Sequence, residues 1–171
     1  MTLINAEMHA AVGEELRRTV SFPIDRSDIR RWAIAVYWPE PPPEYFWDQK
    51  AAESTRHQGI VAPEDFNPFA WMAADGPSPT GADQGGHDPD STERRLGVRP
   101  AGLSFQLNGG LEVDYGVRMR PGDVITSVVR LGGYTERPGK LGPMLFTVFE
   151  DTWTNQHGDQ VKRSRSTLIR Y

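Results

Sequence analysis

The pattern of apolar and polar positions divides the chain into a helical first half and a second half of strands. Residues 62–74 carry apolar side chains on nearly every side of a helix, and such a helix is buried in a folded domain. Pro63 suits its first position, and Glu64 and Asp65 complement the positive end of its dipole. Pro68 kinks the helix or restarts it one turn later. We predict that this helix is the centre of the domain.

After residue 100 the spacing of apolar residues changes from helical to alternating. Four stretches predict long antiparallel strands: 103–117, 124–135, 144–154 and 160–171. In the first stretch, Asn108, Gly109 and Gly110 fit either a hairpin turn or a bulge in one bent strand. The order of elements predicts an α+β fold, in which one strongly curved antiparallel sheet wraps around the central helix.

The clearest amphipathic helix covers residues 25–36. Its apolar residues recur at positions i, i+3, i+4 and i+7: Ile29, Trp32, Ala33 and Val36. Asp25 or Ser27 caps its N-terminus. Three arginines on its other sides are expected to face solvent: Arg26, Arg30 and Arg31. Shorter elements are predicted around it, namely a lead-in helix at 3–16, a strand at 19–24 and a polar helix at 48–56.

Residues 37–47 contain four prolines and five aromatic residues, a composition that favours a stiff, extended loop. So many aromatic side chains need cover. One interpretation is a lid over the domain's own core. The other is an overhanging loop that borders a ligand tunnel or a partner surface.

Residues 75–100 are rich in glycine and proline and predict a long flexible loop. Loops of this length in compact domains are commonly functional or disordered. Arg94, Arg95 and Arg99 lie at its end. They form either a solvated basic cluster or a set of contacts to ligand phosphates.

Composition excludes several classes of function. The chain has 171 residues, a net charge of −4 and no basic tract, so nucleic acid is not an expected partner. It has no cysteine, which excludes disulfides and thiolate metal sites. No apolar run has membrane-spanning length, and residues 1–18 lack the pattern of a signal peptide. We expect a cytoplasmic protein that binds neither metal nor cofactor.

Several segments together resemble the MaoC-like hot-dog family: 28–33 (DIRRWA), 59–63 (GIVAP), the 120–123 turn (RPGD) and the 155–159 turn (NQHGD). More narrowly, the chain resembles the N-terminal, FAS1-like dehydratase domain of that family and the accessory subunit of paired hydroxyacyl-thioester dehydratases. This resemblance covers nearly the whole chain and implies a single hot-dog domain over residues 1–171.

The resemblance implies reversible addition of water to a trans-2-enoyl thioester, which an Asp and a His catalyse together. The family supplies them from an Asp-x-Asn-Pro-x-His segment. That pattern falls on residues 40–45 here, where Glu40 stands for the Asp and Tyr45 for the His. A tyrosine with a pKa near 10 does not replace imidazole as a base at neutral pH. None of the four histidines is predicted to be catalytic.

Three functions fit these observations. The first is an accessory subunit that helps to form an acyl tunnel, while a catalytic MaoC-like chain supplies the dyad for an acyl-CoA or acyl-carrier-protein thioester. The tunnel residues would be Tyr37, Trp38, Phe66, Phe69, Trp71 and Met72. The second is a homodimeric hot-dog thioesterase that uses Glu64 or Asp65, although compensation of the helix dipole is the more common reason for such carboxylates. The third is a non-enzymatic acyl-thioester binding protein.

Overall fold

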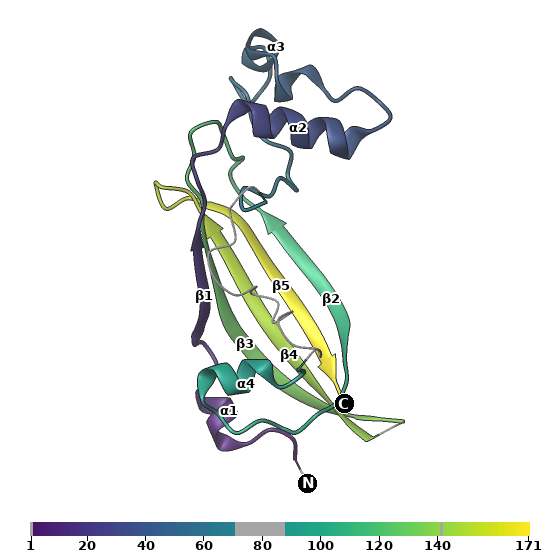
Figure 1. Ribbon diagram of the computed structural model, residues 1–171. Coiled ribbons are helices and arrows are strands. Elements are labelled where there is room, and N and C mark those ends of the chain that lie inside the picture. The colour runs from purple at the N-terminus through teal and green to yellow at the C-terminus, as the bar shows by residue number, and fades with distance from the viewer. Residues whose placement is uncertain (1, 71–87, 141) are drawn as a thin grey trace.

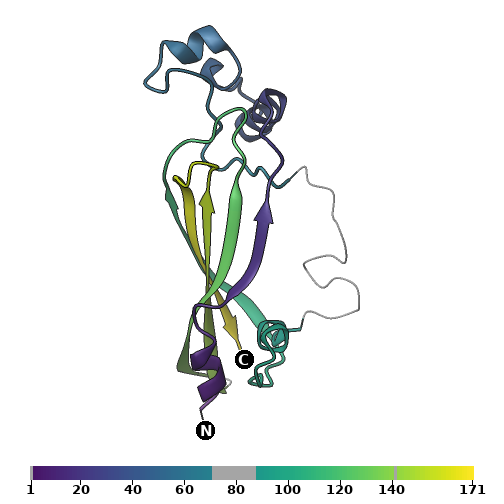
Figure 2. The same ribbon diagram turned by 90° about the vertical axis from the view of Figure 1, so that its left-hand side faces the viewer.

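The computed structural model describes residues 2–70, 88–140 and 142–171. Its centre is one five-stranded antiparallel sheet with the strand order β1-β3-β4-β5-β2. The strands are β1 (Glu15–Val20), β2 (Gln106–Tyr115), β3 (Thr126–Gly139), β4 (Gly142–Thr154) and β5 (Gln160–Arg170). Figures 1 and 2 show that these strands are long and that the sheet is twisted and curved. The predicted α+β fold with a curved antiparallel sheet is confirmed.

Two bulges bend the strands. The pairing of β2 with β5 shifts between Asn108 and Gly110, so the glycine-rich stretch is a bulge in one strand and not a hairpin turn. A Cβ atom on Gly109 would lie 2.9 Å from Cγ1 of Ile169, which is too close for any other residue. A second shift in β3 lies between Leu131 and Gly133. Each bulge increases local twist and thereby contributes to the curvature of the sheet.

The helices gather at the two ends of the sheet (Figures 1 and 2). They are α1 (Ala6–Ala10), α2 (Arg26–Tyr37), the 3-10 helix η1 (Glu44–Phe46), α3 (Gln49–Glu53) and α4 (Ser91–Leu96). Helices α2 and α3 lie beyond one end, and α1 and α4 lie near the other. This arrangement separates the proline-rich loop after α2 from the arginines of α4.

Helix α2 confirms the amphipathic prediction. The side chain of Asp25 accepts a hydrogen bond of 2.7 Å from the amide of Ser27, and Ile29 and Ala33 are buried. The lead-in helix, in contrast, is confined to α1. It ends at Ala10 with Ala11 as its C-cap, and Gly13 in the following turn has a positive φ of 96°. The amide of Gly13 donates to the carbonyl of Leu131 at 2.8 Å, next to the start of β1. The first strand therefore lies earlier than predicted.

The predicted central helix is wrong over its described part, residues 62–70, which contain two turns and no helix. The amide of Phe66 donates to the carbonyl of Pro63 at 3.1 Å, and the amide of Ala70 donates to that of Asn67 at 3.2 Å. The side chain of Asn67 also accepts from the amide of Phe69 at 3.0 Å. These local bonds, with Pro68 between them, replace the helical ladder. Residues 71–74, including Trp71 and Met72, lie outside the described residues.

The predicted loop at 75–100 is also corrected in its described part, because residues 91–96 form α4. Gly97 ends this helix in the left-handed conformation, with a φ of 68°. Glu93 is fully buried and joins α4 to the sheet through Arg170. Tertiary contact therefore stabilises a helix that is too short to form alone.

The hydrophobic core lies where α2, α3 and residues 60–66 meet the end of the sheet. Its buried members come from nearly every part of the chain: Ile24, Ile29, Ala33, Phe46, Ala52, Ile60, Val61, Ala62, Phe66, Met119, Ile125, Trp153 and Val161. The partly buried rings of Trp32, Tyr45 and Phe69 pack against this cluster. Phe66 and Phe69 of the predicted tunnel therefore share one cluster with Tyr45 and Phe46 of the proline-rich loop.

Candidate functional site

Glu40 and Tyr45, the positions predicted to stand for the catalytic Asp and His, lie between α2 and α3. Glu40 is exposed, and its backbone amide donates a 2.8 Å hydrogen bond to the carbonyl of Tyr37. Tyr45 is half-buried, with its ring 4.4 Å from that of Phe46. Among the described residues, the structure gives no hydrogen bond between Glu40 and Tyr45. The two side chains are therefore not arranged as an acid–base pair.

His57 lies beside Tyr45, with a distance of 6.0 Å between ring centroids. It is half-buried. Burial lowers the pKa of His57, and the nearby charges of Arg56, Arg118 and Arg120 lower it further. The imidazole is consequently neutral at pH 7. Among the described histidines, His57 is the one whose ring contacts Tyr45. Its place in the sequence did not suggest this contact.

The proline-rich loop covers part of the domain's own core, as the first interpretation predicts, and its role beside a ligand tunnel or partner stays a prediction. Phe46 is 2 % exposed and belongs to the core, with Tyr37 packed at 5.9 Å from its ring. Trp38 is 78 % exposed. One end of the loop thus covers the domain's own core, and the other end presents an indole to the surroundings.

Phe66 and Phe69, two of the predicted tunnel residues, face different elements. The ring of Phe66 packs edge-on against Trp32 of α2 at 5.7 Å. The ring of Phe69 packs edge-on against Trp153 of β4 at 5.0 Å. Phe66 is 1 % exposed, whereas Phe69 is partly buried. Phe69 is the better placed of the two to contact a ligand, since part of its surface is uncovered.

A polar group under Phe69 was not predicted from the sequence. Asp151 accepts a hydrogen bond of 2.6 Å from Ser127 and one of 2.8 Å from the indole N–H of Trp153. The ammonium of Lys162 lies 3.6 Å from the centroid of the Trp153 ring. Burial lowers the pKa of Lys162, although Asp151 and Asp65 oppose that shift. The alternation of the strand could have indicated this group, because Asp151 lies an even number of positions from buried Leu145 and Trp153 and therefore on the same face of β4.

The carboxylates considered for a thioesterase are both engaged. The hydroxyl of Tyr115 donates to Asp65, and this bond, with burial and the charge of Glu64, raises the pKa of Tyr115 to about 12. Glu64 pairs with Arg118 at 2.8 Å. Because residues 62–70 form no helix, compensation of a helix dipole does not explain these carboxylates.

The three arginines predicted to contact phosphate do not converge. Arg94 pairs with Asp88 at 2.8 Å. Arg95 borders a cleft of about 210 Å³ between α4 and the sheet, on which Arg17 also lies. The backbone of Arg99 bonds to residues of the N-terminal segment: its amide donates to Glu7 at 2.9 Å, and its carbonyl accepts from Asn5 at 2.8 Å. Phosphate binding at these residues stays a prediction.

A buried ionic cluster joins α4 to the inner face of the sheet. The guanidinium of Arg170 donates two hydrogen bonds to Glu93, at 2.7 and 2.8 Å, and one of 2.7 Å to Thr147. The hydroxyl of Tyr134 donates to Glu93 at 2.7 Å. Asp90 accepts from two amides that follow α4 and lies 3.6 Å from Arg170. This cluster fixes the position of α4, and sequence spacing gave no sign of it.

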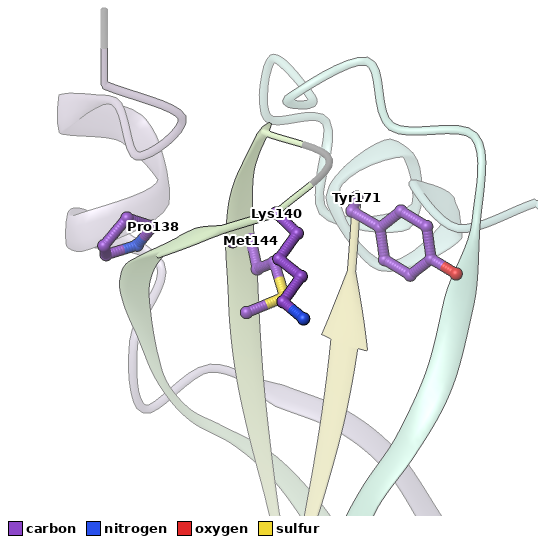
Figure 3. Close-up of a pocket in the computed structure, with 5 residues that line it drawn as sticks. Pro138, Lys140, Met144 and Tyr171 are labelled. Carbon is purple, nitrogen blue, oxygen red and sulfur yellow. The ribbon is translucent and has the colours of Figure 1, made fainter.

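Figure 3 shows a second cavity at the opposite end of the sheet from α2. It has a volume of about 600 Å³ and is bordered by Pro138, Gly139, Lys140, Met144 and Tyr171. The ring of Tyr171 stacks on that of Phe105 at 5.6 Å. This cavity lies away from Glu40 and Tyr45, so it is not part of the dyad-equivalent site.

The part of the chain that the structure describes contains no group of three or more residues suited to hold a metal ion. Within that same part, no helix is long and apolar enough to cross a bilayer.

Comparison with known proteins identifies the family. The sequence model of the FAS1-like, dehydratase domain region matches residues 10–164. The chain belongs to this family. A search of curated proteins found no match to this chain.

Solved structures agree with this assignment of fold. A chain of the ChsH1-ChsH2 complex from Mycobacterium tuberculosis is 20 % identical, with a TM-score of 0.69 over 97 % of this chain and 88 % of that chain. A MaoC-like dehydratase from Rhodospirillum rubrum is 22 % identical, with a TM-score of 0.55 over 94 % and 92 %. A chain of the HadBC (3R-hydroxyacyl-ACP dehydratase) complex from M. tuberculosis is 18 % identical, with a TM-score of 0.54 over 92 % and 99 %. The FAS1-like dehydratase region therefore has the hot-dog fold.

Proposed function

We propose that this FAS1-like dehydratase region is an accessory subunit of a heteromeric (R)-specific enoyl-thioester hydratase, or 3-hydroxyacyl-thioester dehydratase. A partner MaoC-like chain supplies the Asp and His, and this chain helps to form the acyl tunnel. The observation that carries the proposal is the state of the dyad-equivalent positions. Glu40 is exposed and has no hydrogen bond to Tyr45 among the described residues, so neither replaces the missing pair.

The uncovered edge of the sheet supports a partner of the same fold. β2 is an edge strand, and Leu107, Leu111 and Tyr115 on it are all exposed. An exposed edge of this length invites a further strand. Two of the similar structures are complexes of two differently named chains, which is the assembly proposed here. Pairing through β2 would continue the sheet into the partner.

The aromatic residues at the α2 end support the role in acyl binding. Phe69 is partly uncovered above Trp153, and Trp38 is exposed at the start of the proline-rich loop. Apolar and aromatic surface of this kind suits an acyl chain. Phe66, in contrast, acts mainly in the core, because it is nearly fully buried against Trp32.

The test is reconstitution with a MaoC-like chain that carries the Asp-x-Asn-Pro-x-His pattern. We expect the isolated chain to give no hydration of crotonyl-CoA or longer enoyl-CoA, and the complex to give turnover. Replacement of the partner's Asp or His should abolish that turnover, whereas Glu40→Gln in this chain should leave it unchanged. Turnover by the pure chain that disappears in the Glu40→Gln variant would refute the accessory role.

The thioesterase and binding-protein alternatives give different results in the same experiment. A thioesterase would hydrolyse acyl-CoA without a partner. Its candidate carboxylates, Asp65 and Glu64, are engaged by Tyr115 and Arg118, which disfavours that reaction. A binding protein would associate with acyl thioesters and give no turnover in any combination.

A further inference from the structure

The N-terminal half of α2 borders a cavity that the proposed function does not use. Its volume is about 580 Å³, within the range of small-molecule sites. The residues that border it, here named the α2 arginine pocket, are Asp25, Arg26, Ser27, Arg30, Arg31, Ile34 and Trp47. The three arginines are exposed, as their helical spacing predicted, and they also border one shared hollow.

The positive charge of this pocket is only partly compensated. Arg26 donates to the neutral amide oxygen of Gln49 at 3.1 Å. Arg31 has an acidic neighbour, Asp28, at the long distance of 3.9 Å. Within the described residues, the side chain of Arg30 makes no hydrogen bond or ion pair. Asp25 is engaged as the helix cap by a 2.7 Å bond from the amide of Ser27.

The spacing of these charges is itself unfavourable. Arg26 and Arg30 are four residues apart on one helix, where like charges repel and destabilise the helix. Arg31 follows directly. The repulsion among these three arginines is offset by few partners within the chain, although the net charge of the chain is −4. An anionic ligand would offset it.

The wall of the pocket is apolar and aromatic. Trp47 and Ile34 are each 44 % exposed beside the arginines. Guanidinium groups bind phosphate through paired hydrogen bonds, and an exposed indole is a platform for a planar base. A ligand that satisfies both features is a phosphorylated nucleoside.

We propose that the α2 arginine pocket binds a nucleotide phosphate group, with the base on Trp47 and the phosphates on Arg26, Arg30 and Arg31. Two sources share this chemistry: a free adenine nucleotide and the nucleotide end of a CoA thioester. The second source rests on the proposed function and would make CoA, not a carrier protein, the carrier of the acyl group. The concave shape favours a small ligand over the acidic helix of a carrier protein.

The test is calorimetric titration of the full chain and of its reconstituted complex with adenosine 3′,5′-bisphosphate, CoA and inorganic pyrophosphate. We expect all three to bind, and to bind more weakly as salt is raised. The triple variant Arg26→Gln, Arg30→Gln, Arg31→Gln should weaken the binding of each by more than about tenfold, since each lost charge-assisted bond contributes on the order of a tenfold change. Circular dichroism verifies that the variant is folded.

The matched control is the triple variant Arg18→Gln, Arg130→Gln, Arg163→Gln. It removes the same charge from exposed ion pairs on the strands, and its affinity for the bisphosphate should equal that of the wild type. Trp47→Ala provides a second, independent variant. It should weaken adenosine bisphosphate several-fold and leave pyrophosphate unchanged, because pyrophosphate has no base to stack.

Two outcomes would overturn the inference. One is equal nucleotide affinity in the wild type and the α2 triple variant. The other is a chain that binds no nucleotide but loses affinity for a holo acyl carrier protein in that variant, which would make this face a protein-docking surface.

The failure of this inference and the failure of the proposed function are distinguishable. In the complex, hydration of an enoyl-CoA is compared with hydration of the N-acetylcysteamine thioester, which lacks the nucleotide. If the complex hydrates both thioesters and the α2 triple variant changes neither rate, the nucleotide site is refuted and the proposed function stands. If the complex gives no turnover but the α2 triple variant loses nucleotide binding, the nucleotide site is supported and the proposed function is refuted.

Discussion

Replacement of Arg170 by methionine should destabilise the protein strongly. The substitution keeps most of the volume but removes a guanidinium that is 1 % exposed and that donates to Glu93, Thr147 and the carbonyl of Pro89. Glu93 would keep only the hydroxyl of Tyr134 as a side-chain donor and would remain as an uncompensated buried charge.

The expected loss is about 3–5 kcal/mol, the usual consequence of removing one partner of a buried ion pair. Total stabilities are about 5–15 kcal/mol, so the variant would lose a large part of its stability. For a chain of this size, the loss corresponds to a fall in Tm of roughly 6–20 °C. Urea unfolding, followed by circular dichroism at pH 7, measures it.

The decisive comparison is the double variant Arg170→Met, Glu93→Leu. The double variant no longer leaves Glu93 as a buried charge without its partner, and Asp90 keeps its bonds from the amides of Gly102 and Leu103, so the double variant should be more stable than Arg170→Met alone. Arg163→Met is the control, because its pair with Glu150 is exposed and should contribute no more than about 1 kcal/mol. A loss below about 1 kcal/mol for Arg170→Met, or strict additivity in the double variant, would refute the reasoning.

The same cluster predicts an acid-dependent stability. Burial alone would raise the pKa of Glu93, but the hydrogen bonds from Arg170 and Tyr134 and the charge of Arg170 hold it below its ordinary value of 4.5. Unfolding returns the carboxyl to that ordinary value, so the unfolded state binds more protons in the interval between the two pKa values. The contribution of Glu93 is therefore complete above pH 4.5 and is lost as the pH falls through the lower, folded-state pKa. A Glu93→Gln variant should show a shallower fall in urea midpoint over that interval, and an identical fall would contradict the assignment.

Three further predictions concern the acyl site, the assembly and α2. Phe69→Ala in the reconstituted enzyme should impair turnover of long enoyl thioesters more than of short ones, and an equal loss for all lengths would indicate a purely structural role. The chain alone should self-associate and, with a catalytic MaoC-like chain, form a complex that buries roughly 1,200–2,000 Å²; a monomer at micromolar concentration that ignores the partner in sedimentation would contradict this. Asp25→Ala should lower the free energy of unfolding by about 1 kcal/mol through loss of the α2 cap. An unchanged urea midpoint would show that this capping bond does not stabilise the protein.

The elements that could be predicted from the sequence are those with a local cause. Alternation predicts the three long strands after residue 124, and the apolar spacing with Asp25 predicts α2. The helix predicted over residues 62–70 is wrong because the apolar content of this segment reflects burial, while Pro68 and the side chain of Asn67 favour turns. Helix α4 was missed because its stability comes from Glu93 and its partner 77 positions away in the sequence.

The candidate site could be predicted in part. The family pattern located Glu40 and Tyr45, and the structure adds that no hydrogen bond joins them among the described residues. The group around Asp151 was missed because its members, Ser127 and Lys162, lie on different strands and meet only through the register of the sheet. Periodicity describes one strand at a time and carries no information on that register.

The bulge in β2 has a consequence for the choice of partner. Leu107 pairs with Ile169 and Leu111 with Ser166, three positions apart on β5, so these two leucines point to opposite faces although they are four residues apart. A regular strand added to this edge would match the side-chain pattern on only one side of the bulge. Unrelated strands and misaligned copies of the same chain are therefore poor templates for addition. The irregular edge therefore favours the addition of a strand with a complementary bend over the addition of a regular one.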